Sequence, residues 1–125
     1  MVHSYKELIV WQKAIKLVVL VYALTKNFPR EEIYRLTSQI RRAAVSIPAN
    51  IAEGRMRSTR KDYANFLHTA YASGGELETH LEIARQLPET SKLYYTEVEQ
   101  LLDEVMRMLN SMITKLFPKA NQLSS

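Results

Sequence analysis

The sequence predicts an all-α fold, an antiparallel up-down-up-down bundle of four helices, on three observations. Apolar residues recur at alternating steps of three and four along most of the chain, which is the repeat of an amphipathic helix. Only three glycines and four prolines are present, too few for the many turns of an all-β fold. A length of 125 residues suits one domain, so we expect residues 1–125 to form a single four-helix bundle.

The first helix is expected at about residues 8–27, after a lead-in where Ser4 and Glu7 have the spacing of a capping box. Its apolar arc is wide and extends beyond a regular seam of five residues, namely Leu8, Trp11, Ile15, Val18 and Tyr22. Two neighbouring helices in a small bundle do not bury so wide an arc. The pattern therefore indicates either a subunit interface or a deeply placed central helix.

The second helix is expected at about residues 31–53, with Pro48 inside it. A proline removes one backbone donor, and its ring crowds the carbonyl four residues earlier. The apolar positions keep the same phase on both sides of Pro48, which favours a bend. The alternative is a break, with Ser46 capping a new helix. Gly54 is expected to end the helix, because glycine readily adopts a left-handed backbone conformation.

A line of polar residues runs beside the apolar stripe of this second helix. A solvated flank would look similar, but the line contains Gln, Ser and Asn rather than the more strongly hydrated Lys and Glu. We therefore expect buried hydrogen bonds or a groove that makes subunit or partner contacts. The residues concerned are Arg35, Gln39, Arg42, Ser46, Asn50 and Glu53.

The third and fourth helices are expected at about residues 59–87 and 92–117. Ser58 or Thr59 is the predicted cap of the third helix. Two adjacent glycines, Gly74 and Gly75, lie in its interior at a cost of about 1 kcal/mol each, which indicates a packing reason. Pro118 is predicted to stop the fourth helix, and residues 119–125 to form a frayed tail.

The composition excludes several classes of protein. No cysteine is present, so the chain has no disulfide framework and no thiolate metal site, which fits a cytoplasmic protein. The apolar run at residues 17–24 is far shorter than the ~20 residues of a membrane helix, and no small-residue cleavage site follows it. We therefore expect a buried helix there and no membrane partner.

The chain has a formal net charge of +4, and its positive charge is concentrated in one segment. Residues 26–61 contain nine basic and three acidic residues, which predicts an electropositive end or face. The candidates for nucleic-acid contact are Arg41, Arg42, Arg55, Arg57, Arg60 and Lys61. The other interpretation is a solvated loop whose arginines pair with acidic residues of the last two helices. Tyr63 either stacks on a base or fills the core.

No pattern of catalytic residues is recognisable. A di-metal site in a four-helix bundle needs a Glu-x-x-His pattern on each of two helices, and the predicted helices contain none. Glu76 and His80 share a helix face but lack further ligands, so a surface pair is the simpler interpretation. Phosphate-binding loops and nucleophile elbows are absent from the sequence. We expect a non-enzymatic protein without cofactor or metal.

Several segments carry a family resemblance. They are residues 4–14, Phe28-Pro29, residues 36–54 with the run Ser-Ile-Pro-Ala-Asn-Ile-Ala-Glu-Gly, Phe66-Leu67 and residues 76–79. With these segments, nearly the whole chain resembles the 23S rRNA intervening-sequence proteins. The resemblance implies an antiparallel four-helix bundle that assembles into homopentamers. It assigns no catalytic residue.

A related branch of this family is formed by the accessory proteins of diversity-generating retroelements. The resemblance to that branch implies binding of a reverse transcriptase and of nucleic acid through a basic surface. Two functions are therefore expected as alternatives. One is a homo-oligomeric bundle that binds RNA or DNA. The other is a protein-interaction scaffold, for example for a reverse transcriptase or a ribosome-associated protein, without direct nucleic-acid contact.

Overall fold

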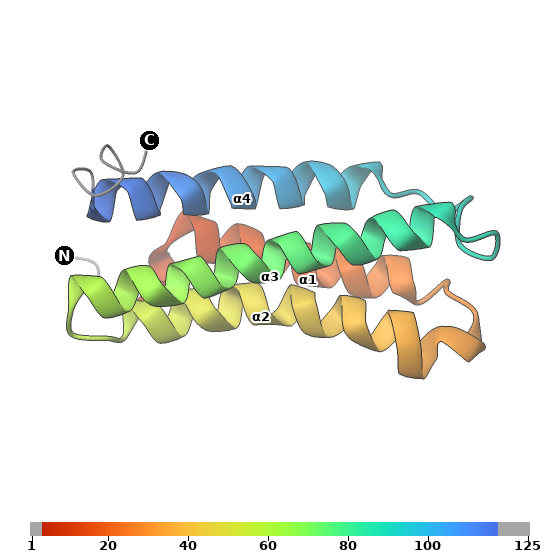
Figure 1. Cartoon of the computed structure of the whole chain (residues 1–125), viewed down its shortest axis with the longest axis horizontal. Helices are drawn as coiled ribbons and strands as arrows, with labels where there is room; N and C mark the ends of the chain where they lie inside the picture. Colours follow the sequence, from red (N-terminus) through yellow and green to blue (C-terminus); the bar gives the residue numbers. More distant parts are fainter. Residues whose placement is uncertain (1–3, 118–125) are drawn as a thin grey trace.

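The structure, a computed structural model, describes residues 4–117, apart from the side chains of Ile33 and Tyr34. This part of the chain contains four α-helices in an antiparallel up-down-up-down arrangement and no β-strand, which confirms the predicted fold class (Figure 1). The expectations for Pro118 and residues 119–125 fall outside the described residues. The helices are α1 (Ile9–Thr25), α2 (Ser38–Arg55), α3 (Arg60–Gln86) and α4 (Thr96–Leu116).

Helices that follow one another in the sequence pack side by side, and α4 returns to pack against α1. The most extensive contact joins α2 and α3. Ion pairs bridge two of the other helix pairs, Lys13 Nζ to Glu104 Oε2 at 3.0 Å and Arg85 Nη1 to Glu99 Oε2 at 3.0 Å. The start of α1, the α2–α3 turn and the end of α4 all lie at the same end of the bundle (Figure 1).

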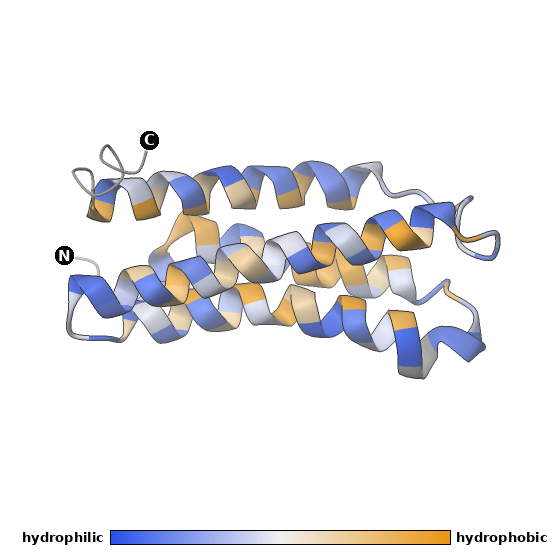
Figure 2. Cartoon of the chain, in the orientation of Figure 1, coloured by the Kyte–Doolittle hydropathy of each residue, from blue (hydrophilic) through white to orange (hydrophobic). Residues whose placement is uncertain are grey.

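The core lies along the axis of the bundle, where apolar bands of the helices face one another (Figure 2). On α1 the buried side chains include Val10, Ala14, Leu17 and Val21. The predicted seam is therefore wrong in phase. Its members are half-buried, as Leu8, Trp11 and Val18 are, or exposed, as Ile15 and Tyr22 are. The wide apolar arc explains the error, because either flank gives a regular seam and only the packing shows which part points inward.

Helix α2 continues through Pro48, which is buried, so the helix is not broken there. Its beginning differs from the prediction, since a 3₁₀ turn (Arg30–Glu32) and a π-turn (Ile33–Thr37) precede Ser38. A π-turn holds one residue more than an α-turn and so changes the phase of the helix.

The expectation for Gly54 is wrong. This residue lies inside α2, which ends at Arg55, and no glycine in the described part of the chain has a positive φ. Its role is steric instead. A Cβ added there would lie 2.7 Å from Phe66 Cβ and 3.2 Å from the carbonyl oxygen of Tyr63, so glycine lets α2 and α3 approach closely.

The helix caps follow local hydrogen bonds. Thr59 caps α3, as one of the two predicted residues, because its Oγ1 accepts a hydrogen bond from the Asp62 N–H at 3.1 Å. The predicted capping box does not form, since Ser4 Oγ accepts from the Lys6 N–H at 3.1 Å and caps a separate 3₁₀ turn (Tyr5–Glu7). Before α4, which begins at Thr96, the loop is fixed by a hydrogen bond that Tyr95 Oη donates to the Thr90 carbonyl at 2.8 Å.

Candidate nucleic-acid interface

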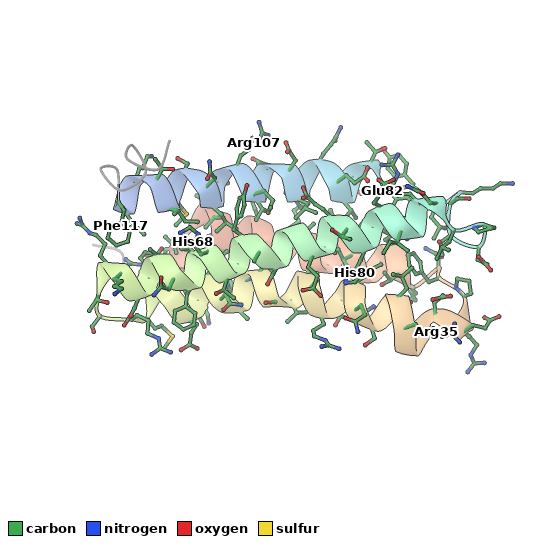
Figure 3. All side chains as sticks on the ribbon, in the orientation of Figure 1. Arg35, His68, His80, Glu82, Arg107 and Phe117 are labelled. Atoms are coloured by element: carbon green, nitrogen blue, oxygen red, sulfur yellow. The ribbon has the colours of Figure 1, made fainter. Side chains whose placement is uncertain are left out.

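The six candidate residues, five arginines and one lysine, fall into two groups that are separated along the axis of α2. Arg41 and Arg42 lie in its first half, whereas Arg55 is its last residue. The 14 positions from Arg41 to Arg55 correspond to about 21 Å along the helix axis. Arg35 lies at one end of the bundle and Phe117 at the other (Figure 3). The basic segment therefore does not form one continuous site within a single chain.

In the first group, Arg41 is held by its own bundle. Its guanidinium carbon lies 4.4 Å from the centre of the Tyr22 ring, and its Nε donates a hydrogen bond to Thr25 Oγ1 at 2.8 Å. Thr25 in turn donates to the Val21 carbonyl at 2.8 Å. These contacts fasten α2 to α1, so Arg41 has a structural role here.

Arg42, its neighbour, is exposed and has no hydrogen-bond or ion-pair partner within residues 4–117. It lines an open groove of about 630 Å³ on the α1–α2 side of the bundle. The lining of the groove combines apolar side chains with two arginines. The lining residues are Tyr22, Thr37, Ser38, Arg41, Arg42, Val45 and Ser46.

The second group forms the turn between α2 and α3, and we call Arg55, Arg57, Arg60 and Lys61 the basic turn. Arg57, Arg60 and Lys61 are exposed, whereas Arg55 is half-buried and engaged in contacts of its own. Arg60 and Lys61 begin α3, where the unpaired backbone N–H groups add positive potential. The basic turn therefore presents three accessible cations within five residues at one end of the bundle.

Arg57 is the most closely constrained of these cations. Its Nη2 donates a charge-assisted hydrogen bond to Glu53 Oε2 at 2.7 Å, one helical turn earlier. Its guanidinium carbon lies 4.7 Å from the centre of the Phe66 ring on α3. Both contacts hold the guanidinium against the bundle, yet 45% of the side chain stays exposed.

Residues from the two chain ends add to this charge. Lys6 precedes α1, Lys115 lies in the last turn of α4, and both are exposed. The start of α1 and the end of α4 lie at the end of the bundle that holds the α2–α3 turn (Figure 1). With the basic turn they make six cationic residues against three acidic ones, Glu7, Glu53 and Asp62, a local charge of +3. Because the helices are antiparallel, charged residues that are far apart in the sequence come together at this end of the bundle.

Tyr63 belongs to the core rather than to an exposed stacking surface. It is half-buried, and its Cδ1 would lie 3.1 Å from a Cβ added at Gly54. Burial raises the pKa of its phenol, an effect that the nearby Arg55 partly offsets. Of the two interpretations made from the sequence, the structure supports core packing.

Two of the six residues of the polar line, Ser46 and Asn50, form hydrogen bonds within the bundle. Ser46 Oγ and Ser73 Oγ are 2.7 Å apart across the α2–α3 contact. Asn50 Nδ2 donates to the Ser46 carbonyl at 2.8 Å and to Ser46 Oγ at 2.9 Å. Gln39 is half-buried, and Arg35 and Glu53 at the two ends of the line are exposed. The predicted line thus contains one internal hydrogen-bonded pair, Ser46 and Asn50, whereas its charged members Arg35, Arg42 and Glu53 are exposed.

Glu76 and His80, the acid and imidazole considered as metal ligands, form a pair on the surface of α3. His80 Nε2 lies 3.3 Å from Glu76 Oε2 on the exposed side of α3, an ordinary pair one helical turn apart (Figure 3). Within residues 4–117, no group of three or more potential metal ligands comes together.

Exposed apolar side chains form a further surface that the sequence predicted only in part. Ile15, Val19 and Tyr22 follow one another on the outer side of α1, with 37%, 62% and 43% of their surface accessible. Val45 on α2 adjoins Tyr22 across the groove and is 42% exposed. We call these four residues the apolar face. Ile15 and Tyr22 belong to the seam predicted for the first helix, so part of its wide apolar arc lies on the surface of the bundle rather than in the core.

Sequence reasoning missed two residues that shape the basic turn. Phe66 lies beneath Arg57, and Met56 is 74% exposed at the tip of the turn. The spacing of Glu53 and Arg57 predicts their ion pair, because residues four apart share a helix face. No local signal predicts Phe66, since it reaches Arg57 only through the packing of α3 on α2.

Fold and site together define an all-helical bundle protein with three exposed cations at the turn between α2 and α3. The chain belongs to the family described as 23S rRNA-intervening sequence protein, whose sequence model matches residues 6–111. No described helix is both long and apolar enough to cross a membrane.

A solved structure agrees with this assignment. It is the crystal structure of a protein with unknown function from the S23 ribosomal protein family from Bacteroides thetaiotaomicron VPI-5482. That protein is 26% identical to this chain and superposes with a TM-score of 0.70, covering 84% of this chain and 98% of its own. The search of curated proteins found no match.

Proposed function

We propose that this protein is a cytoplasmic, non-enzymatic homo-oligomer that binds RNA or another nucleic acid through its basic turn. The observation that carries the proposal is the set of three exposed cations, Arg57, Arg60 and Lys61, at the start of α3. A phosphate backbone is attracted by such a set because each contact releases condensed counterions. Lys6 and Lys115 extend the same electropositive end.

Assembly is proposed to proceed through the apolar face. Ile15, Val19, Tyr22 and Val45 expose large apolar side chains side by side, and burying them against other copies is favourable. Cyclic symmetry then presents one basic turn per subunit. Weak single contacts with one RNA molecule become strong when several turns bind it together. The resemblance to the family suggests a pentamer.

Salt-dependent RNA binding tests this proposal. We expect the affinity for a single-stranded RNA, measured by fluorescence anisotropy, to fall steeply with rising KCl. Replacing Arg57, Arg60 and Lys61 with alanine removes up to three phosphate contacts, so the slope of log K against log salt should shrink by about 2. Binding that ignores salt would overturn the proposal.

A matched control separates the basic turn from general charge. Replacing Arg85, Lys92 and Arg107 with alanine also removes three positive charges, but from exposed positions outside the basic turn. We expect this variant to keep the salt slope of the wild type to within about half a unit, since it removes no proposed contact. An equal loss in both variants would show that only the net charge matters.

A protein-interaction scaffold is the second candidate. The groove of about 630 Å³ on the α1–α2 side favours it, because a lining that combines apolar side chains with Arg41 and Arg42 suits an acidic amphipathic segment of a partner. A reverse transcriptase or a ribosome-associated protein is the expected class of partner. Retention of such a partner after nuclease treatment, with loss on Arg42→Glu, would favour this function over nucleic-acid binding.

A further inference from the structure

We infer that the basic turn binds unpaired nucleobases by stacking them on the guanidinium of Arg57, which makes single-stranded RNA its preferred ligand over duplex RNA. This inference rests on the proposed function and specifies the ligand of the same site. It depends on the contacts of one arginine with Glu53 and Phe66 and on the exposed side chains around it.

The guanidinium of Arg57 is supported on one face and held at one edge. The Phe66 ring supports the face, with 4.7 Å between the guanidinium carbon and the ring centre. Glu53 Oε2 holds the edge by accepting from Nη2 at 2.7 Å. Since 45% of the side chain is exposed, the guanidinium remains accessible to a ligand while these two contacts hold it. A planar cation supported in this way loses little conformational freedom on binding.

A supported guanidinium plane suits a nucleobase. Unpaired bases stack on aromatic rings and on arginine planes in many RNA-binding sites, and such stacking tolerates any base sequence. Beside Arg57, Met56 exposes 74% of its surface and offers an apolar contact for the same or the next base. Arg60 and Lys61, a few residues on, are positioned for the phosphates that flank a stacked base.

Duplex RNA would use only part of this site. Its bases are paired and stacked, and its major groove is too narrow and deep for side chains to enter. A duplex therefore meets the cations of the basic turn through phosphates alone. The difference between single-stranded and duplex binding measures the contribution of stacking at Arg57.

The test compares ligands that differ in bases but not in phosphates. We would measure binding to a uridine homopolymer of roughly 12 nucleotides, to an abasic strand of the same length and to a blunt duplex with the same number of phosphates. At one salt concentration, the wild-type protein should bind the homopolymer about tenfold more tightly than either other ligand, because only the homopolymer offers free bases.

Arg57→Lys is the decisive variant, since it keeps the charge and removes the plane. The variant should bind the homopolymer about tenfold more weakly than the wild type does. Its affinities for the abasic strand and the duplex, and the slope of log K against log salt for each ligand, should stay within about twofold of the wild-type values. Arg107→Lys is the matched control. Arg107 also pairs with a carboxylate one turn earlier, Asp103 at 3.2 Å, and projects from α4 with no aromatic contact in the described residues (Figure 3).

The possible failures are distinguishable. Equal, salt-dependent binding of all three ligands, unchanged in Arg57→Lys, would overturn the stacking inference and leave the proposed function standing. Absence of salt-dependent binding to any ligand would overturn the proposed function itself. An equal effect of Arg57→Lys and Arg107→Lys on the homopolymer would show that the loss is not specific to a supported guanidinium, and it would likewise overturn the inference.

Discussion

Substituting each of the three glycines with alanine adds one methyl group and tests how closely the helices pack at that position. A Cβ added at Gly75 meets no atom within 4 Å, whereas one added at the adjacent Gly74 would overlap Sδ of Met106 on α4. A Cβ at Gly54 would lie 2.7 Å from Phe66 Cβ. Substitution to alanine therefore places a methyl group in open space at Gly75, against a buried flexible side chain at Gly74, and against the neighbouring helix α3 at Gly54.

The expected magnitudes follow from this order. In a helix interior, alanine is favoured over glycine by about 1 kcal/mol, so Gly75→Ala should raise the free energy of unfolding by about that amount. Gly74→Ala has the same gain, but Met106 is 91% buried and must repack at a cost of about 1–3 kcal/mol, which makes the variant neutral or less stable. Gly54→Ala should lose most, about 3 kcal/mol, because α2 and α3 must separate.

Urea and thermal unfolding followed by far-UV circular dichroism measure these differences. All variants should be compared at one protein concentration, since self-association shifts apparent stability. A change of 1 kcal/mol corresponds to a shift in Tm of about 3–5 °C for a chain of this size. The reasoning is refuted if Gly74→Ala gains as much as Gly75→Ala, or if Gly54→Ala is the most stable of the three.

Three further predictions concern assembly, the α2–α3 contact and pH. Val19→Glu should dissociate the proposed oligomer without loss of helicity, because it places a charge in the apolar face; light scattering after gel filtration measures the mass. Ser73→Ala should cost about 1 kcal/mol in urea unfolding, because Ser46 loses its partner at 2.7 Å. Burial raises the pKa of Tyr63 and Tyr95 above 10, so the folded state favours the neutral phenols. The free energy of unfolding should therefore be constant just below pH 10 and fall as the pH rises above 10. Urea unfolding at a series of pH values measures this decrease.

Local bonding made much of the fold predictable from the sequence. Thr59 caps α3 because a hydroxyl one residue before the helix satisfies a free N–H, and this depends on a few neighbouring residues. The phase of α1 was not predictable in the same way. Leu17 and Ile15 both belong to regular apolar patterns, and only contact with α2 and α4 selects Leu17 for the core. Gly54 shows the same limit, since a glycine near a helix end has two possible roles.

The candidate site was predictable in composition but not in arrangement. The sequence shows that residues 26–61 are basic, yet Arg41 is fastened to Tyr22 and Thr25 by contacts across the α1–α2 hairpin. No spacing within α2 indicates those contacts. Arg57 acquires its position in the same way from Phe66, a residue on the following helix. In a bundle, the role of each cation depends on the opposing helix, which sequence periodicity does not identify.

The up-down topology decides which cations act together. The start of α1, the α2–α3 turn and the end of α4 lie at the same end of the bundle (Figure 1). Lys6 and Lys115 are 109 positions apart in the sequence, but each is next to one of these helix termini and so lies at the same end as the basic turn. Arg41 is only 14 positions from Arg55 but lies about 21 Å away along α2. A basic surface in this fold is thus built from turns and chain ends of one side. Charges added at that end should strengthen RNA binding more than equal charges added near Arg41, because only the former enter the local field of the basic turn.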